Sequence, residues 1–310
     1  MSPKKTKKRA KKKLKIRTNN EKGAFVMKQK EISADMIKEL RERTGVGMGK
    51  CKEALVLAEG DMEKAIDVLR KAGMASGVKK EGRETKEGLI LTAEDKHHLV
   101  IAEANAETDF VVQNDRFKHF LHDAVKQALE SKSKSLAELV QQPYYKDKSI
   151  TIDQYRNLVI QALGENIQLR RLETITKHPN CSYGIYSHMG GKLVVIVEIE
   201  GASDQEAIAK EIAMHVAAES PDYLKHEEVP ANVLSREEEI ARSQMQGKPA
   251  NMVEKIVEGK LKAFKDQVCL VTQKYVKDNS VTVNQFLETC ARKIGKPLTI
   301  RCFWRWKVGQ

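Results

Sequence analysis

An internal repeat constrains the fold of this chain more than any other feature of its sequence. The first copy predicts two strands around a polar turn and then a helix, at 88–92, 98–102 and 115–130. The same order recurs further along the chain, at 183–187, 193–197 and 204–218, with the turn at 188–191. The segments between the copies predict one more helix and one more strand, at 149–163 and 167–172. The repeat therefore predicts an α+β core built from two related halves.

Three short helices are predicted ahead of the repeat, because apolar residues recur at helical spacing from Ser33 onward. The run 44–49 is too rich in glycine to continue the first helix, and the second is expected over 50–59. Asp61 is expected to cap the third helix, and Gly73 is expected to end it. A bundle of this size has little room for an active site. We therefore expect a binding module.

Helical patterns return after Pro230. Two predicted helices, at 235–246 and 251–266, are separated by the short break Gly247-Lys248-Pro249, which predicts an antiparallel helical hairpin. Periodicity leaves open whether this hairpin protrudes as a contact arm or packs on the core as an ordinary helix pair. The chain closes with a predicted helix and a predicted strand, at 281–294 and 298–308.

These segments give an expected division of the chain. It runs from a basic disordered tail through a three-helix module, a linker, two core halves and a helical hairpin to the end of the second half with a C-terminal module. In chain order these parts occupy 1–30, 31–75, 76–87, 88–172, 173–229, 230–266 and 267–310.

The net charge of +12 belongs mostly to the tail. Residues 1–26 hold eleven Lys and Arg against Glu21 alone, so the rest of the chain carries only +2. By composition the tail cannot bury a core, and we expect it to be disordered. It could contact RNA or acidic partners through counterion release, or it could be sequence upstream of a true start at Met27. Both alternatives stay open at this point.

Composition favours a soluble, cytoplasmic protein. No apolar run approaches the roughly 20 residues of a membrane-spanning helix, and the basic tail lacks the apolar segment of a signal peptide. The five cysteines form no Cys-x-x-Cys pair, which argues against a zinc site and fits reduced thiols. The hydrophobic content of 41% is enough for about two or three domains with cores of their own.

Patterns typical of catalytic sites are missing. The sequence has no Gly-x-Ser-x-Gly elbow, no His-Glu-x-x-His and no cofactor fingerprint. His97 and His98 fall at the first predicted hairpin turn, and His215 falls inside a helix, where we expect a packing role. The residues therefore favour a binding protein over a metabolic enzyme, with no cofactor and no metal.

The stretch 105–111 is the best candidate for a contact site, because it follows an apolar run and offers a carboxylate beside an aromatic ring. Thr108 is a plausible N-cap, and Asp109 would then lie at the positive end of a helix. Taken alone, the stretch is most typical of a capped helix whose Phe110 packs in the core.

Several runs together resemble the bacterial-type elongation factor Ts family. They occur in the order and at roughly the spacing of that family, and they cover about residues 28–310, so that only the basic tail falls outside. The matching runs are 37–48, Thr108-Asp109-Phe110-Val111, Gly164-Glu165-Asn166-Ile167, 212–218 and Gly247-Lys248-Pro249.

The resemblance implies a ubiquitin-associated-like N-terminal module, a two-part core, an inserted helical hairpin and a C-terminal module. It also implies guanine-nucleotide exchange on elongation factor Tu, a GTPase, without covalent chemistry. In this family the turn that matches Thr108, Asp109, Phe110 and Val111 is associated with displacing the Mg²⁺ of the GTPase. The main competing interpretation is an RNA-binding or ribosome-associated protein, suggested by the tail and by the Trp, Arg and Lys residues at 304–307.

Three further contacts follow from the resemblance alone. Arg41 and Met48 match positions of the first module that touch the GTPase, and His188 matches a histidine near it. Gly49 stands where some members have a second methionine, so part of that apolar contact is expected to be absent. The alternative interpretation is a solvated helix face for Arg41 and a core position for Met48.

Overall fold

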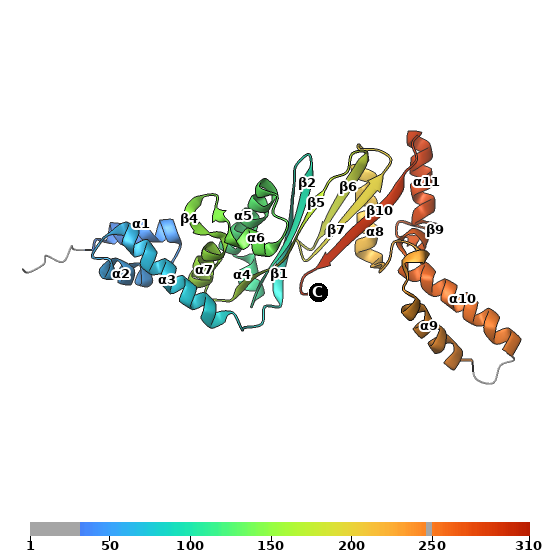
Figure 1. The fold of residues 1–310 in the computed structure, drawn as a ribbon, viewed down its shortest axis with the longest axis horizontal. Helices are drawn as coiled ribbons and strands as arrows, with labels where there is room; N and C mark the ends of the chain where they lie inside the picture. Colours follow the sequence, from blue (N-terminus) through green and yellow to red (C-terminus); the bar gives the residue numbers. More distant parts are fainter. Residues whose placement is uncertain (1–31, 246–249) are drawn as a thin grey trace, which may run out of the picture.

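The computed structural model describes residues 32–245 and 250–310. The predictions made for the tail and for the break at 247–249 lie outside the described residues. Within them the fold is α+β, as the sequence predicts: small antiparallel sheets are combined with helices in two related halves (Figure 1). No described helix is long and apolar enough to cross a membrane.

Helices α1 (Ala34–Thr44), α2 (Met48–Leu57) and α3 (Met62–Lys80) form the N-terminal bundle. The predicted cap of α3 is confirmed, because the Asp61 side chain accepts from the Lys64 N–H. Helix α1 ends where the glycine-rich run begins, and Gly45 after it is left-handed. The second helix begins at Met48, two residues before the predicted start. The bundle has its own small apolar core, centred on Leu40, Leu55 and Leu69.

The prediction that Gly73 ends the third helix is wrong, because α3 continues to Lys80. Gly73 and Gly77 lie where α3 packs on α7 (Ile152–Leu163). A Cβ at Gly77 would lie 1.9 Å from Oδ1 of Asn157, so the missing side chain lets the two helices approach closely. These glycines are packing positions within a helix. The first residues of the expected linker, 76–80, are consequently helical.

The first half of the core begins with the predicted hairpin, β1 (Glu87–Glu94) and β2 (His98–Ala106), which pair antiparallel. Strand β5 (Ile167–Thr176) adds to β2 and completes a sheet in the order β1-β2-β5. Between β2 and β5 the chain forms α4 (Asp109–Gln113), α5 (Asp115–Ser131), α6 (Leu136–Gln141), β3 (Pro143–Tyr144), β4 (Asp147–Thr151) and α7. The helix α5 covers this sheet with two fully buried rings, Phe117 and Phe120.

The second half repeats this plan. Strands β6 (Cys181–His188) and β7 (Leu193–Glu200) form the predicted hairpin, and α8 (Glu206–Glu219) follows it. After the helical hairpin come β8 (Lys274–Tyr275), β9 (Asp278–Thr282), α11 (Val283–Ile294) and β10 (Thr299–Lys307). The sheet order is β10-β7-β6.

The duplication is more complete than the sequence analysis predicts, since β3, β4 and α7 have counterparts in β8, β9 and α11. Each of these helices starts in a capping box, Thr151 with Gln154 and Thr282 with Gln285. The residues before these two helices form the short strands β4 and β9. The helices, predicted to begin at 149 and 281, consequently begin at Ile152 and Val283.

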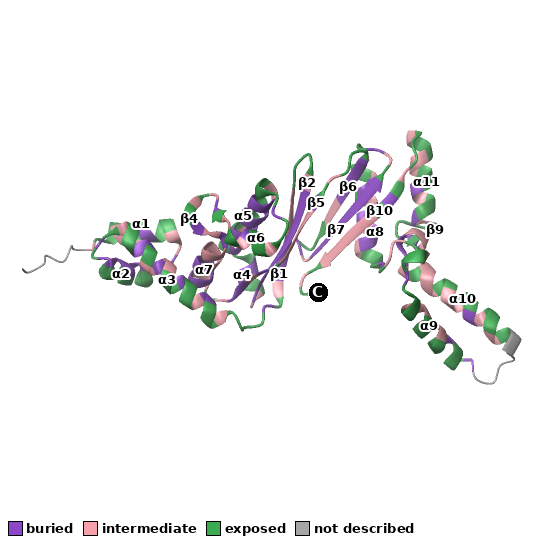
Figure 2. Ribbon diagram, viewed as in Figure 1, coloured by how far each residue is buried: buried purple, intermediate pink, exposed green. Residues whose placement is uncertain are grey.

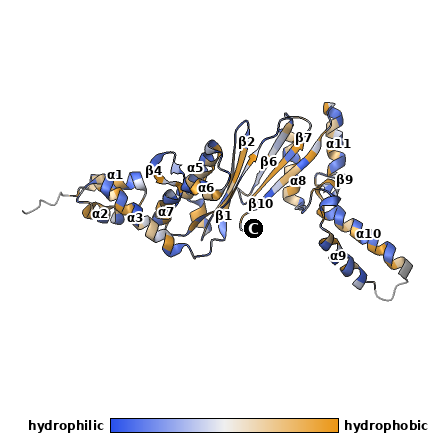
Figure 3. Cartoon of the chain, in the orientation of Figure 1, coloured by the Kyte–Doolittle hydropathy of each residue, from blue (hydrophilic) through white to orange (hydrophobic). Residues whose placement is uncertain are grey.

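The two sheets pack face to face through buried side chains of both hairpins, including Ile90, Leu99, Ile101, Tyr183, Val194 and Ile196. The central strands β2 and β7 are almost wholly buried and rich in apolar residues, whereas the outer strand β10 is mostly half-buried (Figures 2 and 3). Trp304 and Trp306 help to join the halves: the Trp304 indole donates to Glu173, and the Arg171 guanidinium lies 4.2 Å from the centre of the Trp306 ring. A strand with two faces, rather than a base-stacking surface, thus accounts for these rings.

The helical hairpin consists of α9 (Ala231–Ser243) and α10 (Ala250–Val268), which pack on one another. Figure 1 shows this pair extending away from both sheets. Of the two alternatives left open by periodicity, the protruding arm is the one observed. Arg242 of α9 joins the two helices through Glu254 of α10, and it also pairs with Glu238 one turn earlier in α9.

A candidate partner-binding surface

The turn after β2 displays Asp109 and Phe110 to solvent. The Thr108 hydroxyl accepts from the Val111 N–H at 3.4 Å, so Thr108 is the N-cap of α4 as predicted. Phe110 is 84% exposed, whereas Val111 and Val112 are buried in the core. The local prediction that Phe110 packs in the core is therefore wrong, because the two valines that follow it fill that place.

Glu165 holds this turn in position from the loop between α7 and β5. Its two carboxylate oxygens accept from the Thr108 N–H at 3.0 Å and from the Thr108 hydroxyl at 2.7 Å. A second contact joins the same two segments with donor and acceptor exchanged: Glu107, next to the turn, accepts from the Asn166 N–H of the loop at 2.6 Å. Hydrogen bonds to charged acceptors are the stronger kind, so the turn is fixed on the body of the protein rather than free to move.

Arg41 and Met48 lie on the N-terminal bundle, where both are exposed, Met48 by 48%. They line one shallow groove together with Arg116 from the first turn of α5. Arg116 also lies against the bundle: a Cβ at Gly45 would be 1.4 Å from Nη1 of Arg116. Arg116 therefore connects the groove on the bundle with the segment that follows Phe110 in sequence.

His188 is exposed at the end of β6, and its Nδ1 lies 3.1 Å from the Tyr186 hydroxyl. The turn that follows docks on the first half of the core, where the Ile90 N–H donates to the Gly191 carbonyl at 2.8 Å. Because Glu87 pairs with Ala106, the start of β1 and the end of β2 share one edge of the molecule. His188 and the Asp109–Phe110 turn consequently lie at the same edge.

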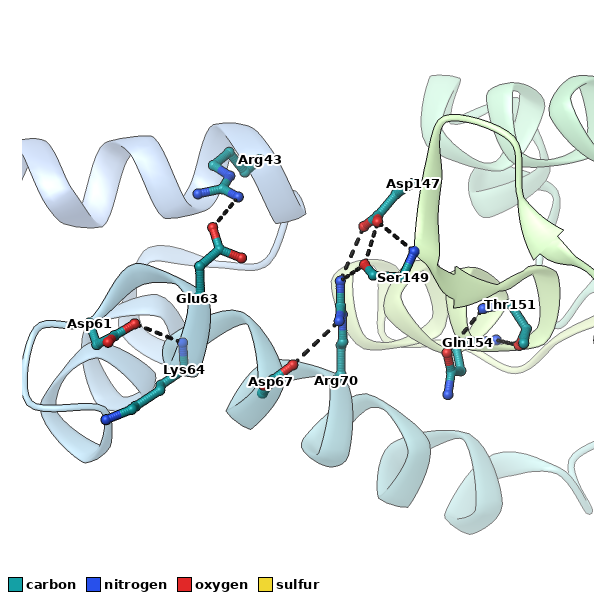
Figure 4. A network of polar contacts seen from close by, with 10 residues as sticks. All are labelled: Arg43, Asp61, Glu63, Lys64, Asp67, Arg70, Asp147, Ser149, Thr151 and Gln154. Carbon is teal, nitrogen blue, oxygen red and sulfur yellow. Dashed lines mark hydrogen bonds and ion pairs between the residues drawn. The ribbon is translucent and has the colours of Figure 1, made fainter.

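The bundle is joined to the core by a polar network around Arg70 of α3 (Figure 4). The Arg70 guanidinium donates to Asp147 at 3.1 Å and to the Ser149 hydroxyl at 2.6 Å. A second pair in the same view, Arg43 with Glu63, lies within the bundle and is largely exposed. The Arg70 contacts thus help to set where Arg41 and Met48 lie relative to Phe110.

The described cysteines and His215 occupy buried or half-buried positions. Burial raises the pKa of the Cys181 thiol to about 11 and that of Cys302 to about 12, with the Glu198 carboxylate adding to both shifts, so these thiols stay protonated at neutral pH. The packing role expected for His215 is confirmed, because the ring is fully buried and hydrogen-bonded to Gln273. The described residues contain no group of three His, Cys, Asp or Glu that could hold a metal ion.

Sequence reasoning missed Glu165 and Arg116 as parts of this surface. Glu165 belongs to the run Gly164-Glu165-Asn166-Ile167, which resembles the elongation factor Ts family but carries no role of its own in the sequence pattern. Its place after a predicted helix and before a predicted strand gave no sign that it meets Thr108, because that contact joins positions far apart in the chain. Arg116 carries no local signal at all.

The chain is similar to known proteins over most of its length. A family model described as "Elongation factor TS" matches residues 107–310. The elongation factor Ts of Protochlamydia amoebophila (strain UWE25) is 56% identical over 279 residues, which cover 90% of this chain and 99% of that relative. The elongation factor Ts of Chlamydia muridarum is 43% identical over the same shares, and that of Chlamydia felis is 42% identical over 278 residues, again 90% of this chain and 99% of the relative.

Proposed function

Since this chain belongs to the elongation factor Ts family, it is a nucleotide exchange factor for elongation factor Tu in translation elongation, and we propose that the turn 108–111 drives the exchange. Exchange of GDP for GTP breaks no covalent bond in this protein. Family membership also gives the GTPase as its partner and the cytoplasm as its location.

The energetic requirement for exchange is one of linkage. A partner that binds the nucleotide-free GTPase more tightly than the GDP-bound form must weaken GDP binding by the same coupling free energy. Each tenfold weakening of GDP binding needs about 1.4 kcal/mol of differential contact, so a thousands-fold weakening needs roughly 4 to 5 kcal/mol. A GTPase holds its nucleotide largely through Mg²⁺ and a phosphate loop, so disturbing either one is sufficient.

The single observation that carries the proposal is an exposed ring beside a carboxylate on a turn that is otherwise fixed. The Phe110 side chain is 84% exposed and can be buried between elements of the GTPase, while Asp109 can compete for the polar neighbours of the metal. Thr108 holds the turn through its hydrogen bonds to Glu165, and Val111 holds it by packing in the core. The free energy of ordering this turn is therefore supplied by folding and not by binding.

We further propose that Arg41 and Met48 contact the GTPase from the bundle and that His188 does so from the β6–β7 turn. Their exposure is compatible with this role. Arg116 is included in the proposed surface because it lines the same groove as Arg41 and Met48.

The test is the rate at which labelled GDP leaves elongation factor Tu, with this protein at micromolar concentration. We expect Asp109→Ala with Phe110→Ala to lose most of the acceleration at concentrations that saturate binding. A matched control is Met252→Ala on the arm, which removes a side chain that is 54% exposed and lies outside the proposed surface. Full acceleration by the double variant would show that the turn is not the element that acts on the nucleotide site.

Contact of the basic tail with RNA is a separate proposal, carried only by the eleven cations at 1–26. If the tail binds RNA, its deletion should lower RNA affinity and reduce the slope of log affinity against log salt, because fewer counterions are released. The exchange rate should persist without the tail. An unchanged salt dependence would rule this contact out.

A further inference from the structure

The tip of the β6–β7 hairpin has a backbone that its sequence does not favour. Met189 has a φ of 49°, in the left-handed region where a side chain is strained, and Gly190 and Gly191 after it also have positive φ. A glycine would adopt this conformation without strain. The methionine therefore destabilises the turn in the free protein.

The side chain of Met189 gains nothing from the fold in return, because it is 74% exposed. A single exposed apolar side chain is ordinary on a protein surface. The combination of an unfavourable φ with an exposed apolar side chain is not ordinary, because both features favour a smaller residue. Strained backbone of this kind is concentrated at functional sites.

The position of Met189 is fixed by the body of the protein. The Gly191 carbonyl accepts from the Ile90 N–H of β1 at 2.8 Å, and a Cβ at Gly191 would lie only 2.8 Å from the Ile90 carbonyl oxygen. Lys192 pairs with Glu87 at the start of the same strand. The turn is thus docked on β1 and is not free to fold back over the sheet.

This docking brings Met189 to the edge that carries Phe110. Glu87, which holds Lys192, pairs with Ala106 at the end of β2, and the Phe110 turn follows directly. The C-terminus marked in Figure 1 ends beside the start of β1, where the Val308 N–H donates to the Lys192 carbonyl at 2.9 Å. Two of the most exposed large apolar side chains therefore come from different halves of the core and lie on one edge.

We propose that Met189 is a further apolar contact with elongation factor Tu, so that the exchange factor holds the GTPase by one exposed apolar side chain from each half of its core. This inference rests on the proposed function of the Phe110 turn. This contact differs in kind from the one proposed for His188. The thioether side chain of Met189 would be buried in an apolar recess of the partner, whereas a histidine can form a hydrogen bond to it. Binding would then bury the apolar surface of Met189 that is exposed to water in the free protein.

Three variants of the full chain test this contact. Met189→Gly removes both the strain and the side chain, Met189→Ala removes the side chain beyond Cβ and keeps the restricted backbone, and Met189→Leu keeps the apolar character. We expect the first two to weaken binding to nucleotide-free elongation factor Tu by about tenfold and Met189→Leu to bind within about twofold of the unmodified protein. Met189→Gly should also melt at the same or a higher temperature, so a folding defect cannot account for the loss.

Two controls separate the effects. Lys132→Gly relieves a similar positive φ, 54°, at the end of α5 and should raise the melting temperature without changing binding. Phe110→Ala, measured alongside, reports on the proposed function itself. Unchanged binding by Met189→Gly and Met189→Ala while Phe110→Ala is impaired overturns the Met189 contact alone; unchanged binding by all three overturns the proposed surface as well. Equal loss in Met189→Leu and Met189→Gly also overturns the contact, because apolar character would then not matter.

Discussion

Thr108 is the residue through which the fold sets the geometry of the exposed turn. Its hydroxyl caps α4 and donates to Glu165, and its N–H donates to the same carboxylate. Thr108→Ala should destabilise the protein by about 1 kcal/mol, as loss of an N-cap usually does, and should slow GDP release several-fold because Phe110 is no longer held in place. The measurements are chemical unfolding and the exchange rate.

The matched control for this variant is Ser135→Ala, which removes the side-chain cap of another short helix, α6. We expect the same loss of stability, about 1 kcal/mol, with an unchanged exchange rate. Equal exchange rates for the two variants would mean that the cap matters only for folding. The N-cap role of Thr108 could be predicted from the sequence, but the contact with Glu165 could not, because no local pattern pairs residues so distant in the chain.

His215 is a residue whose titration should be visible in stability. Burial lowers the pKa of the ring below its usual 6.5, against an opposing hydrogen bond with Gln273. The Nδ1 atom accepts from the Val276 N–H at 3.2 Å, so protonation there would break that bond. Because the unfolded chain takes up the proton first, stability is full above about pH 6.5 and falls as pH decreases, by up to about 1.4 kcal/mol per pH unit.

The check is the free energy of unfolding at pH 7.5 and 5.5 for the unmodified protein and for His215→Gln, which cannot titrate. The variant should lose most of this pH dependence. Met252→Ala serves as the control, since it changes an exposed side chain of the arm that does not titrate and should leave the pH dependence as it was. If His215→Gln retained the full slope, other groups would be responsible for it.

At the scale of elements, the contact between α3 and α7 depends on a glycine within a helix. Gly77→Ala raises helix propensity by about 1 kcal/mol, but its Cβ would lie 1.9 Å from Oδ1 of the buried Asn157. Displacing Asn157 also breaks its hydrogen bond to Asp153. We expect a net loss of about 1 to 2 kcal/mol of stability by chemical unfolding.

Gly259→Ala on α10 is the control, because a Cβ there meets nothing within 4 Å and the substitution should stabilise the protein by up to about 1 kcal/mol. Combining Gly77→Ala with Asn157→Ala should recover part of the loss by removing the obstructing side chain. Equal stabilisation by the two glycine substitutions would contradict a packing role for Gly77.

The element scale also shows where sequence reasoning was sufficient. The two hairpins and the helices α5 and α8 could be predicted because each has a repeated local pattern. The end of α3 could not, because Gly73 resembles a helix stop until its neighbour α7 is known. The strands β3 and β8 have two residues each, too few for a period, although the aligned residues Tyr144 and Tyr275 of the repeat could have revealed them.

At the scale of the whole molecule, the proposed surface lies on two bodies, the bundle and the core, and both would have to meet one partner at once. The groove of Arg41 and Met48 lies on the bundle, and the Phe110 turn lies on the core. A fixed relative position of the two removes an ordering cost from binding. Arg70, whose side chain is only 20% exposed, supplies part of that fixation through Asp147 and Ser149.

Arg70→Ala should therefore weaken binding to elongation factor Tu several-fold, although Arg70 lies outside the proposed contact surface, and should destabilise the protein by about 1 to 3 kcal/mol through its lost hydrogen bonds. Arg43→Ala is the matched control, because it breaks the exposed Arg43–Glu63 pair within the bundle, worth about 0.2 to 1 kcal/mol, and leaves the junction with the core intact (Figure 4). Affinity and amide hydrogen exchange of α3 are the measurements. If Arg70→Ala alone shows both faster amide hydrogen exchange in α3 and weaker binding, the junction pre-organises the surface. Equal affinities for the two variants would mean that the GTPase itself orders the bundle when it binds.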